Sequence, residues 1–127
     1  MKENINNSFE VDYRYDQTYD VLVIKVKKPY SYGKTIEMEE GILLDFDKNN
    51  VPVLLEILDA SKVLNVPKYS LNELLCFYMK VSVSDKLISI VTNFGVLIKD
   101  KETSPILESL VGNYFNMPSI EAELISA

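Results

Sequence analysis

The sequence ILLDFDKNNVPVLLEIL, residues 42–58, contains two apolar segments separated by a short polar turn. Residues 42–47 place isoleucine, leucine and phenylalanine on one face and two aspartates on the other, which is typical of a half-buried strand. Asparagine tolerates the left-handed backbone of a tight turn, so Asn50 predicts that the two segments form a hairpin. Residues 51–58 are apolar on both faces apart from Glu56, so this strand needs cover on both sides, from a helix or a second subunit.

A second hairpin is predicted upstream of this pair. Residues 9–15 alternate between aromatic or apolar side chains and charged ones, and residues 19–28 continue as another strand. Asp16 lies in the turn between them, where its side chain can bond the local backbone. Pro29 ends the second strand because proline has no N–H to donate to a ladder. We expect residues 30–38 to be a connection between the hairpins.

A short helix is predicted over residues 60–64, directly after the fourth strand. Asp59 precedes it, and its carboxylate can accept hydrogen bonds from the free N–H groups of the first turn. Residues 65–68, with Pro67, are the best candidate for a linker. The parts on either side of it are each too small to be stable alone, so we expect a single domain over residues 1–127.

The second half of the chain gives weaker signals. Residues 70–79 combine a capping-box pattern with the alternation of a strand, so both structures stay open there. Residues 87–99 are predicted to be a strand, with Gly95 marking a bulge. Residues 104–115 follow a helix-start pattern and have apolar residues at helical spacing, although a strand is not excluded. Residues 120–125 form a final strand or short helix.

These segments predict an α+β fold that is mainly antiparallel β. We expect a four-stranded meander followed by a short helix, all within residues 9–64. A second β-rich half, residues 67–127, should extend this unit and pack on the same core.

Composition excludes several kinds of chemistry. The chain has no histidine and one cysteine, Cys76, which excludes histidine-based triads, histidine-containing metal sites and an internal disulfide. We expect Cys76 to be buried as a small apolar side chain. The N-terminus has no signal-peptide pattern, and no segment is apolar for long enough to cross a bilayer. We therefore expect a cytoplasmic protein that does not bind membranes.

The charge balance favours protein partners over nucleic acid. The formal net charge is -6, with 13 basic and 19 acidic residues, and Arg14 is the one arginine. Nucleic-acid binding proteins usually neutralise phosphates with a basic stripe and read guanine with arginine. We therefore expect no nucleic-acid binding, and an acidic body of this kind suits a basic protein partner.

Acidic side chains are the best candidates for a chemical site. Asp45 and Asp47 lie two residues apart on one strand, and Glu56 on the next strand can join them if the register allows, which would suit a hard divalent cation. Structural roles account for most of the acidic set: turns, a helix cap and solvated strand faces. We therefore predict no catalytic residue, no cofactor and no bound metal. The candidate ligands, if a metal did bind, are Asp45, Asp47 and Glu56. Glu56 has apolar neighbours, and if it is buried it needs a partner, a lysine or a tyrosine hydroxyl.

Tyrosine is dense in the first third of the chain. Three interpretations stay open for this group: core packing, a protein interface and a small-ligand pocket. Stacking on nucleobases is disfavoured because basic residues do not surround the tyrosines. The residues are Tyr13, Tyr15, Tyr19, Tyr30 and Tyr32.

Three motifs in the first half occur in a known order: YDxxxDxLxI from Tyr15, GILLDFD from Gly41 and EILDAS from Glu56. With them, residues 9–64 resemble a small prokaryotic family, the domain of unknown function numbered twenty-two eighty-three. The resemblance implies a compact β-meander followed by a short helix, with no established activity. It also implies, for some members, an antitoxin-like partnership with a small toxin. Residues 67–127 resemble no family that we can name.

Two classes of function follow from the sequence. The first is a non-enzymatic protein-interaction module, a homodimer that also binds another cytoplasmic protein. The alternative is a metal-dependent hydrolase or small-ligand binder that uses the clustered carboxylates. The chain has no base that could activate a nucleophile, which argues against an enzyme. The metal-dependent hydrolase stays the alternative.

Overall fold

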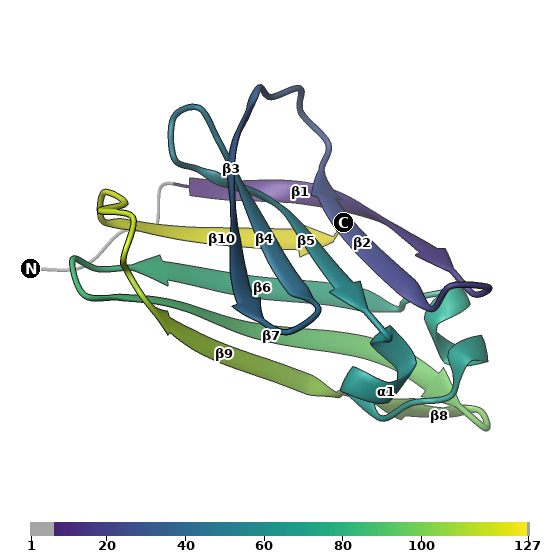
Figure 1. Cartoon of the computed structure of the whole chain (residues 1–127). Helices are drawn as coiled ribbons and strands as arrows, with labels where there is room; N and C mark the ends of the chain where they lie inside the picture. The colour runs from purple at the N-terminus through teal and green to yellow at the C-terminus, as the bar shows by residue number, and fades with distance from the viewer. Residues whose placement is uncertain (1–6, 127) are drawn as a thin grey trace, which may run out of the picture.

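The computed structural model describes residues 7–126 and consists almost entirely of β-strands. Ten strands, one short α-helix and one 3-10 helix follow one another along this part of the chain (Figure 1). The first half contains β1 (Asn7–Asp16), β2 (Val21–Val26), β3 (Tyr32–Glu39), β4 (Ile42–Asp47), β5 (Pro52–Leu58) and α1 (Ala60–Leu64). The second half contains the 3-10 helix η1 (Lys68–Asn72), β6 (Cys76–Val83), β7 (Leu87–Ile98), β8 (Lys101–Thr103), β9 (Ile106–Gly112) and β10 (Ile120–Ser126).

All ten strands belong to one curled sheet. Its order is β3-β4-β5-β2-β1-β10-β6-β7-β8, and β9 also pairs with β7. The sheet curls so that β3, β4 and β5 cross over the layer formed by β10, β6, β7 and β9 (Figure 1). The two edges of the curl meet where the Ser109 hydroxyl on β9 donates to the Met38 carbonyl on β3 at 3.2 Å. The result is a sheet folded over a central core.

Strand β1 joins the two halves of the sheet. Its first part pairs in parallel with β10, with Asn7 opposite Ala122 and Val11 opposite Ser126. Its second part pairs with β2 in an antiparallel ladder that runs to Asp16. Every other ladder among the described residues is antiparallel. The parallel β1–β10 pair therefore connects strands from opposite ends of the chain.

The core lies inside the curl and takes side chains from both halves. Alternation places every second residue of each strand inward, as expected for a sheet with one buried face. Phe77 and Phe94 pack edge to face, with ring centroids 5.2 Å apart. The largest fully buried side chains are Leu22, Ile24, Ile42, Leu44, Phe46, Leu55, Ile57, Leu71, Met79, Ile88, Ile90 and Phe94.

The predicted α+β class is wrong. Within residues 7–126 the one α-helix has five residues, and the second half packs by strand pairing and sheet curvature rather than against a helix. No helix in this part of the chain is long and apolar enough to cross a membrane.

The predicted four-stranded meander is also wrong, because residues 30–38 contain most of β3. Strand β3 is the outermost strand of the sheet. Its Ile36 and Met38 side chains pack into the core, while Thr35 and Glu37 face outward. Strand β5 pairs with β2, so the five strands of the first half lie in the order β3-β4-β5-β2-β1 and not in the order of the chain.

The second half resolves the segments that the sequence left open. Residues 70–79 contain the end of η1 and the start of β6, and the segment 104–115 contains β9, so it takes the strand alternative. Gly95 pairs with Cys76 in an uninterrupted ladder, so the expected bulge is not found there. Cys76 is exposed, against our prediction, because the alternation that buries Phe77 turns its neighbour outward.

Candidate functional site

The two aspartates expected to share a strand face have separate roles. Asp45, on the outer face of β4, accepts a hydrogen bond from the Thr35 hydroxyl at 2.6 Å. Asp47, the last residue of β4, is buried, and its Oδ1 accepts the backbone N–H groups of Asn49 at 2.8 Å and Val51 at 2.9 Å in the turn that follows. The two carboxylates therefore bond different parts of the chain.

Glu56 lies at the middle of β5, opposite Leu43 on β4 and Val23 on β2. It is half-buried, and it makes no hydrogen bond or ion pair with any of the described residues, so the predicted lysine or tyrosine partner is not found. Within residues 7–126, no group of three acidic or cysteine side chains is arranged to hold a metal ion. The carboxylates expected to cluster are therefore not brought together, and the expectation that no metal binds stays a prediction.

A different aspartate forms the tightest polar cluster of the first half. Asp20, in the turn between β1 and β2, is 5% exposed. Its carboxylate accepts hydrogen bonds from the Tyr15 hydroxyl at 2.7 Å, the Ser61 hydroxyl at 2.7 Å and the Ser61 N–H at 3.0 Å. This arrangement caps α1 from a distant turn. Asp59, predicted to be the cap, has a left-handed backbone and makes no side-chain hydrogen bond to the helix.

The cluster shifts the pKa values of its two titratable members. Burial raises the pKa of Asp20, but the hydrogen bonds from Ser61 and Tyr15 outweigh it and the net pKa is lowered. Burial and the hydrogen bond to Asp20 together raise the pKa of Tyr15. Both shifts favour a negative Asp20 and a neutral Tyr15, so the cluster is a structural clamp rather than an acid–base pair.

The five early tyrosines divide between core and surface. Tyr13, Tyr15 and Tyr30 pack against the core as partly buried rings. Tyr19 and Tyr32 are largely exposed. The density of tyrosine in this region therefore has no single cause.

An apolar surface lies on the outer face of β7 and β9. Four side chains that are between 44% and 59% exposed form it: Leu87 and Val91 on β7, Ile106 and Leu110 on β9. Val91 lies opposite Glu108, so it sits between Ile106 and Leu110 across the ladder. We call these four residues the β7–β9 strip.

The loop after β9 extends this strip. Gly112 pairs with Leu87, and the Tyr114 ring lies against Gly112, 2.6 Å from where a Cβ would stand. The Asn113 side chain holds the loop in place through hydrogen bonds to the Ser84 carbonyl, the Met117 carbonyl and the Met117 N–H. The 88% exposed Tyr114 ring is therefore presented beside the strip on an anchored loop.

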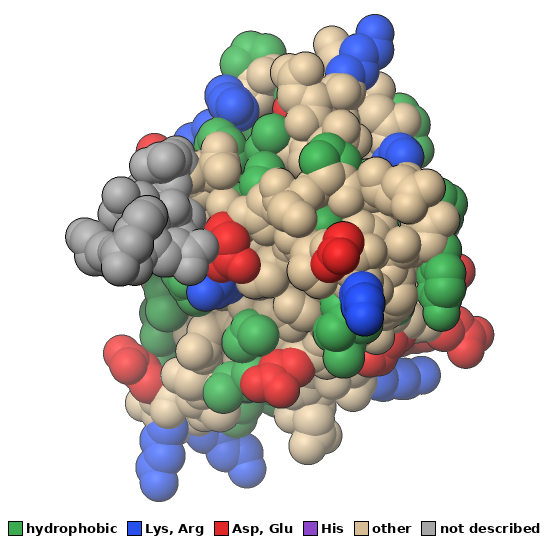
Figure 2. Space-filling view, turned by 90° about the vertical axis from the view of Figure 1, so that its left-hand side faces the viewer, with side chains coloured by type: hydrophobic (Ala, Val, Ile, Leu, Met, Phe, Trp, Pro, Cys, Tyr) green, Lys and Arg blue, Asp and Glu red, His purple; other side chains and the backbone are tan. Residues whose placement is uncertain are grey.

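Charge on the adjoining surface is mixed. Figure 2 shows the end of the molecule seen on the left in Figure 1, where acidic and basic side chains are scattered among apolar ones rather than gathered by sign. Around the strip itself, Val91 is flanked by Glu108 on β9 and by Lys80 on β6. The apolar residues therefore have neighbours of both charges.

Sequence patterns alone do not reveal this surface, because its residues on β9 fit a helical face. Ile106 and Leu110, with Leu107 and Val111, have the spacing of an amphipathic helix. In the structure Leu107 and Val111 face inward, while Ile106 and Leu110 face outward. The signal in the sequence that points to this surface is that residues 106–111, taken as a strand, have apolar side chains on both faces.

Comparisons with known proteins agree with this picture of a chain without an assigned chemistry. Residues 12–61 match the family described as "Protein of unknown function (DUF2283)". An uncharacterized protein of Methanocaldococcus jannaschii is 33% identical over 117 residues, which cover 91% of this chain and 96% of its own. No solved structure gives a significant match.

A second relative carries the name of an enzyme. A protein of Methanosarcina mazei named "Putative hypoxanthine phosphoribosyltransferase" is 30% identical over 87 residues, 68% of this chain and 70% of its own. The M. jannaschii match also extends well beyond the segment that the family covers. The resemblance predicted from the three motifs is confirmed: the chain belongs to the DUF2283 family of proteins of unknown function.

Proposed function

We propose that this chain is a protein-interaction module and that its β7–β9 strip binds a second copy of the same chain. The observation that carries the proposal is that the four half-exposed side chains are diagonal neighbours on two adjacent strands. Contiguous apolar patches on small proteins often mark interaction surfaces, whereas isolated exposed leucines need no explanation.

The expected affinity is modest. Burying the remaining exposed part of each side chain contributes about 1 kcal/mol, or roughly 8 kcal/mol for the eight side chains of two copies. Association costs about 4–15 kcal/mol in lost translational and rotational freedom. Even at the low end of that cost, the strip alone gives about 4 kcal/mol, so the dimer would be weak and would populate at about millimolar concentration and above.

The charges beside the strip favour a second copy as the occupant. Glu108 and Lys80 lie on either side of Val91 in one row across the sheet. A two-fold axis through Val91 and parallel to the strands brings the Glu108 carboxylate of one copy toward the Lys80 ammonium of the other, which also lies 3.2 Å from the Glu121 carboxylate of its own chain. This local complementarity offsets part of the repulsion between two chains of net charge -6.

A basic partner protein is a further expectation, supported by the net charge and not by the strip. An antitoxin-like role would be a special case of it, and it is supported by the family resemblance alone. We do not extend phosphoribosyl transfer to this chain.

Single-cysteine cross-linking tests the proposed surface. Cys76→Ser first removes the exposed native thiol. Val91→Cys then places a thiol on the two-fold axis at the centre of the strip, and Glu102→Cys on β8 places an exposed thiol away from it. Under mild oxidation at about millimolar concentration we expect a disulfide-linked dimer from Val91→Cys and little from Glu102→Cys. Equal yields from the two variants would contradict the proposal.

A further inference from the structure

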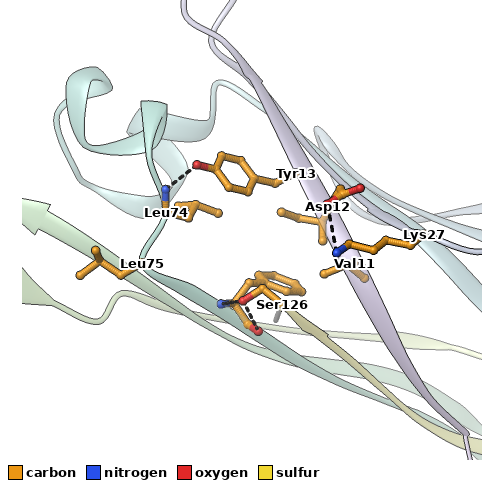
Figure 3. Close-up of a pocket in the computed structure, with 9 residues that line it drawn as sticks. Val11, Asp12, Tyr13, Lys27, Leu74, Leu75 and Ser126 are labelled. Carbon is orange, nitrogen blue, oxygen red and sulfur yellow. Dashed lines mark hydrogen bonds and ion pairs between the residues drawn. The ribbon is translucent and has the colours of Figure 1, made fainter.

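Tyr114 differs from most tyrosines of the chain because its hydroxyl is not used by the fold. Figure 3 shows the more usual case, in which Tyr13 reaches from β1 to Leu74, whose backbone N–H donates to the tyrosine hydroxyl at 2.8 Å. Four other tyrosines also have hydrogen-bonded hydroxyl groups: Tyr15, Tyr32, Tyr69 and Tyr78. Tyr114 is 88% exposed and makes no hydrogen bond through its hydroxyl with the described residues.

The Tyr114 ring lies on the outer face of the sheet, at the end of the β7–β9 strip. Glu108 and Leu110 face outward on β9, so a Cβ at Gly112 would point outward as well. That position is 2.6 Å from the nearest ring atom of Tyr114, so the ring takes the space that a side chain at 112 would fill. The ring therefore continues the outward row of β9 and stands beside Leu87, the residue paired with Gly112.

The loop that carries Tyr114 is anchored to the β6–β7 turn. The Asn113 N–H donates to the Lys86 carbonyl at 2.9 Å, and the buried Asn113 side chain bonds the Ser84 carbonyl and the backbone of Met117. A ring on an anchored loop loses little conformational freedom when a partner covers it, which lowers the cost of association. Tyrosine is also enriched among the residues that contribute most to protein interfaces.

The two-fold axis through Val91 gives this ring a place on the second copy. Gly112 on β9, Leu87 on β7 and Ser84 in the β6–β7 turn lie in one row across the sheet. Gly112 pairs with Leu87, and the Ser84 N–H donates to the Leu87 carbonyl at 2.8 Å. Because the axis runs parallel to β7, it places β9 of one copy opposite β6 of the other. The Tyr114 ring above Gly112 is thereby brought over the partner's Ser84 and beside the partner's Leu87.

We propose that Tyr114 is an anchor of self-association, with each ring packing on Leu87 and the β6–β7 turn of the second copy. This inference rests on the proposed function, because it needs the β7–β9 strip to face a second copy. It adds two large aromatic rings, one from each copy, to the surface that the strip buries. The dimer should therefore form at concentrations at least about tenfold below those that the strip alone would need.

Sedimentation equilibrium of three variants tests this role. Tyr114→Ala should raise the dissociation constant of the dimer at least about tenfold, because it removes the ring from both copies. Tyr114→Phe should stay within about twofold of the wild-type chain, since the ring and not the hydroxyl makes the contact. Tyr19→Ala is the matched control, because Tyr19 is 75% exposed in the β1–β2 turn, away from the strip. Its association should equal that of the wild-type chain.

The outcomes separate this inference from the proposed function. If Tyr114→Ala associates as well as the wild-type chain while Leu110→Ser does not associate, the role of Tyr114 is overturned and the strip stays the interface. If the wild-type chain stays monomeric up to about millimolar concentration, both are overturned. Urea unfolding at a concentration where the chain is monomeric should give Tyr114→Ala the wild-type midpoint. A lower midpoint would assign the ring to the fold and overturn the inference.

Discussion

The Asp20 carboxylate accepts a hydrogen bond from the Ser61 hydroxyl at 2.7 Å and so ties the β1–β2 turn to the first turn of α1. The two residues are 41 positions apart in the sequence. The same carboxylate also accepts the Ser61 N–H and the Tyr15 hydroxyl. A cap of this kind stabilises a helix of five residues that could not persist alone, because short helices are marginal in water.

We expect Asp20→Asn to lower the free energy of unfolding by about 1–2 kcal/mol, because a buried charge-assisted acceptor is lost. Asp59→Asn is the matched control, since both aspartates have positive φ, a conformation that asparagine also tolerates. It should change stability by less than about 0.5 kcal/mol. Urea unfolding of the two variants would measure the difference in the free energy of unfolding. Equal losses would show that the hydrogen bonds to Asp20 do not stabilise the fold.

The clamp also predicts part of the acid sensitivity. Because the folded-state pKa of Asp20 is lowered, its contribution is present above the unfolded value of about 3.9 and is lost as the pH falls through the folded value. The stability difference between the wild-type chain and Asp20→Asn should therefore shrink as the pH falls below about 4. A difference that stays constant down to the acid transition would contradict the lowered pKa.

Tyr78 makes the corresponding prediction at alkaline pH. Burial and its hydrogen bond to Glu123 raise the pKa of Tyr78 to about 12. Its contribution is present below the unfolded value of about 10 and is lost as the pH rises through the folded value. The stability advantage of the wild-type chain over Tyr78→Phe should accordingly shrink between about pH 10 and pH 12. Urea titrations across that interval test this, and parallel pH profiles for the two proteins would argue against it.

Gly33 is required where β3 approaches β4. A Cβ at this position would overlap the Asp47 carbonyl oxygen and lie 2.6 Å from its carbon. Because those atoms belong to the backbone, we expect Gly33→Ala to cost about 2 kcal/mol. Gly112→Ala is the control: its Cβ would meet the exposed Tyr114 ring, which can rotate away, so less than about 0.5 kcal/mol should be lost. Thermal melts that rank the two variants equally would contradict this account.

Much of the first half could be predicted because its signals are local. The predicted strand over residues 42–47 coincides with β4, and Asn50 has the expected positive φ. Asp16 and Asp47 both bond backbone N–H groups in turns, as predicted. Strand β3 was missed because an edge strand needs few buried residues, and Ile36 and Met38 are the two it supplies.

The remaining features depend on contacts between distant residues. The pairing of β1 with β10 joins residues more than a hundred positions apart, and no local pattern specifies it. The role of Asp20 could not be predicted, because it depends on Ser61, which comes from another element. Asp45 and Asp47 were expected to act together, but strand alternation does not show that one bonds the Thr35 hydroxyl and the other the backbone of the next turn.

The mass of the chain in solution tests the central claim, that the β7–β9 strip is an interaction surface, most directly. Sedimentation equilibrium should show the wild-type chain rising from 14.5 kDa toward twice that mass as its concentration increases to about the millimolar range. Leu110→Ser should stay at 14.5 kDa, and Leu97→Ser, a matched exposed leucine on β7 outside the strip, should associate like the wild-type chain. A wild-type chain that stays at 14.5 kDa throughout, or a Leu110→Ser variant that associates equally well, would contradict the account.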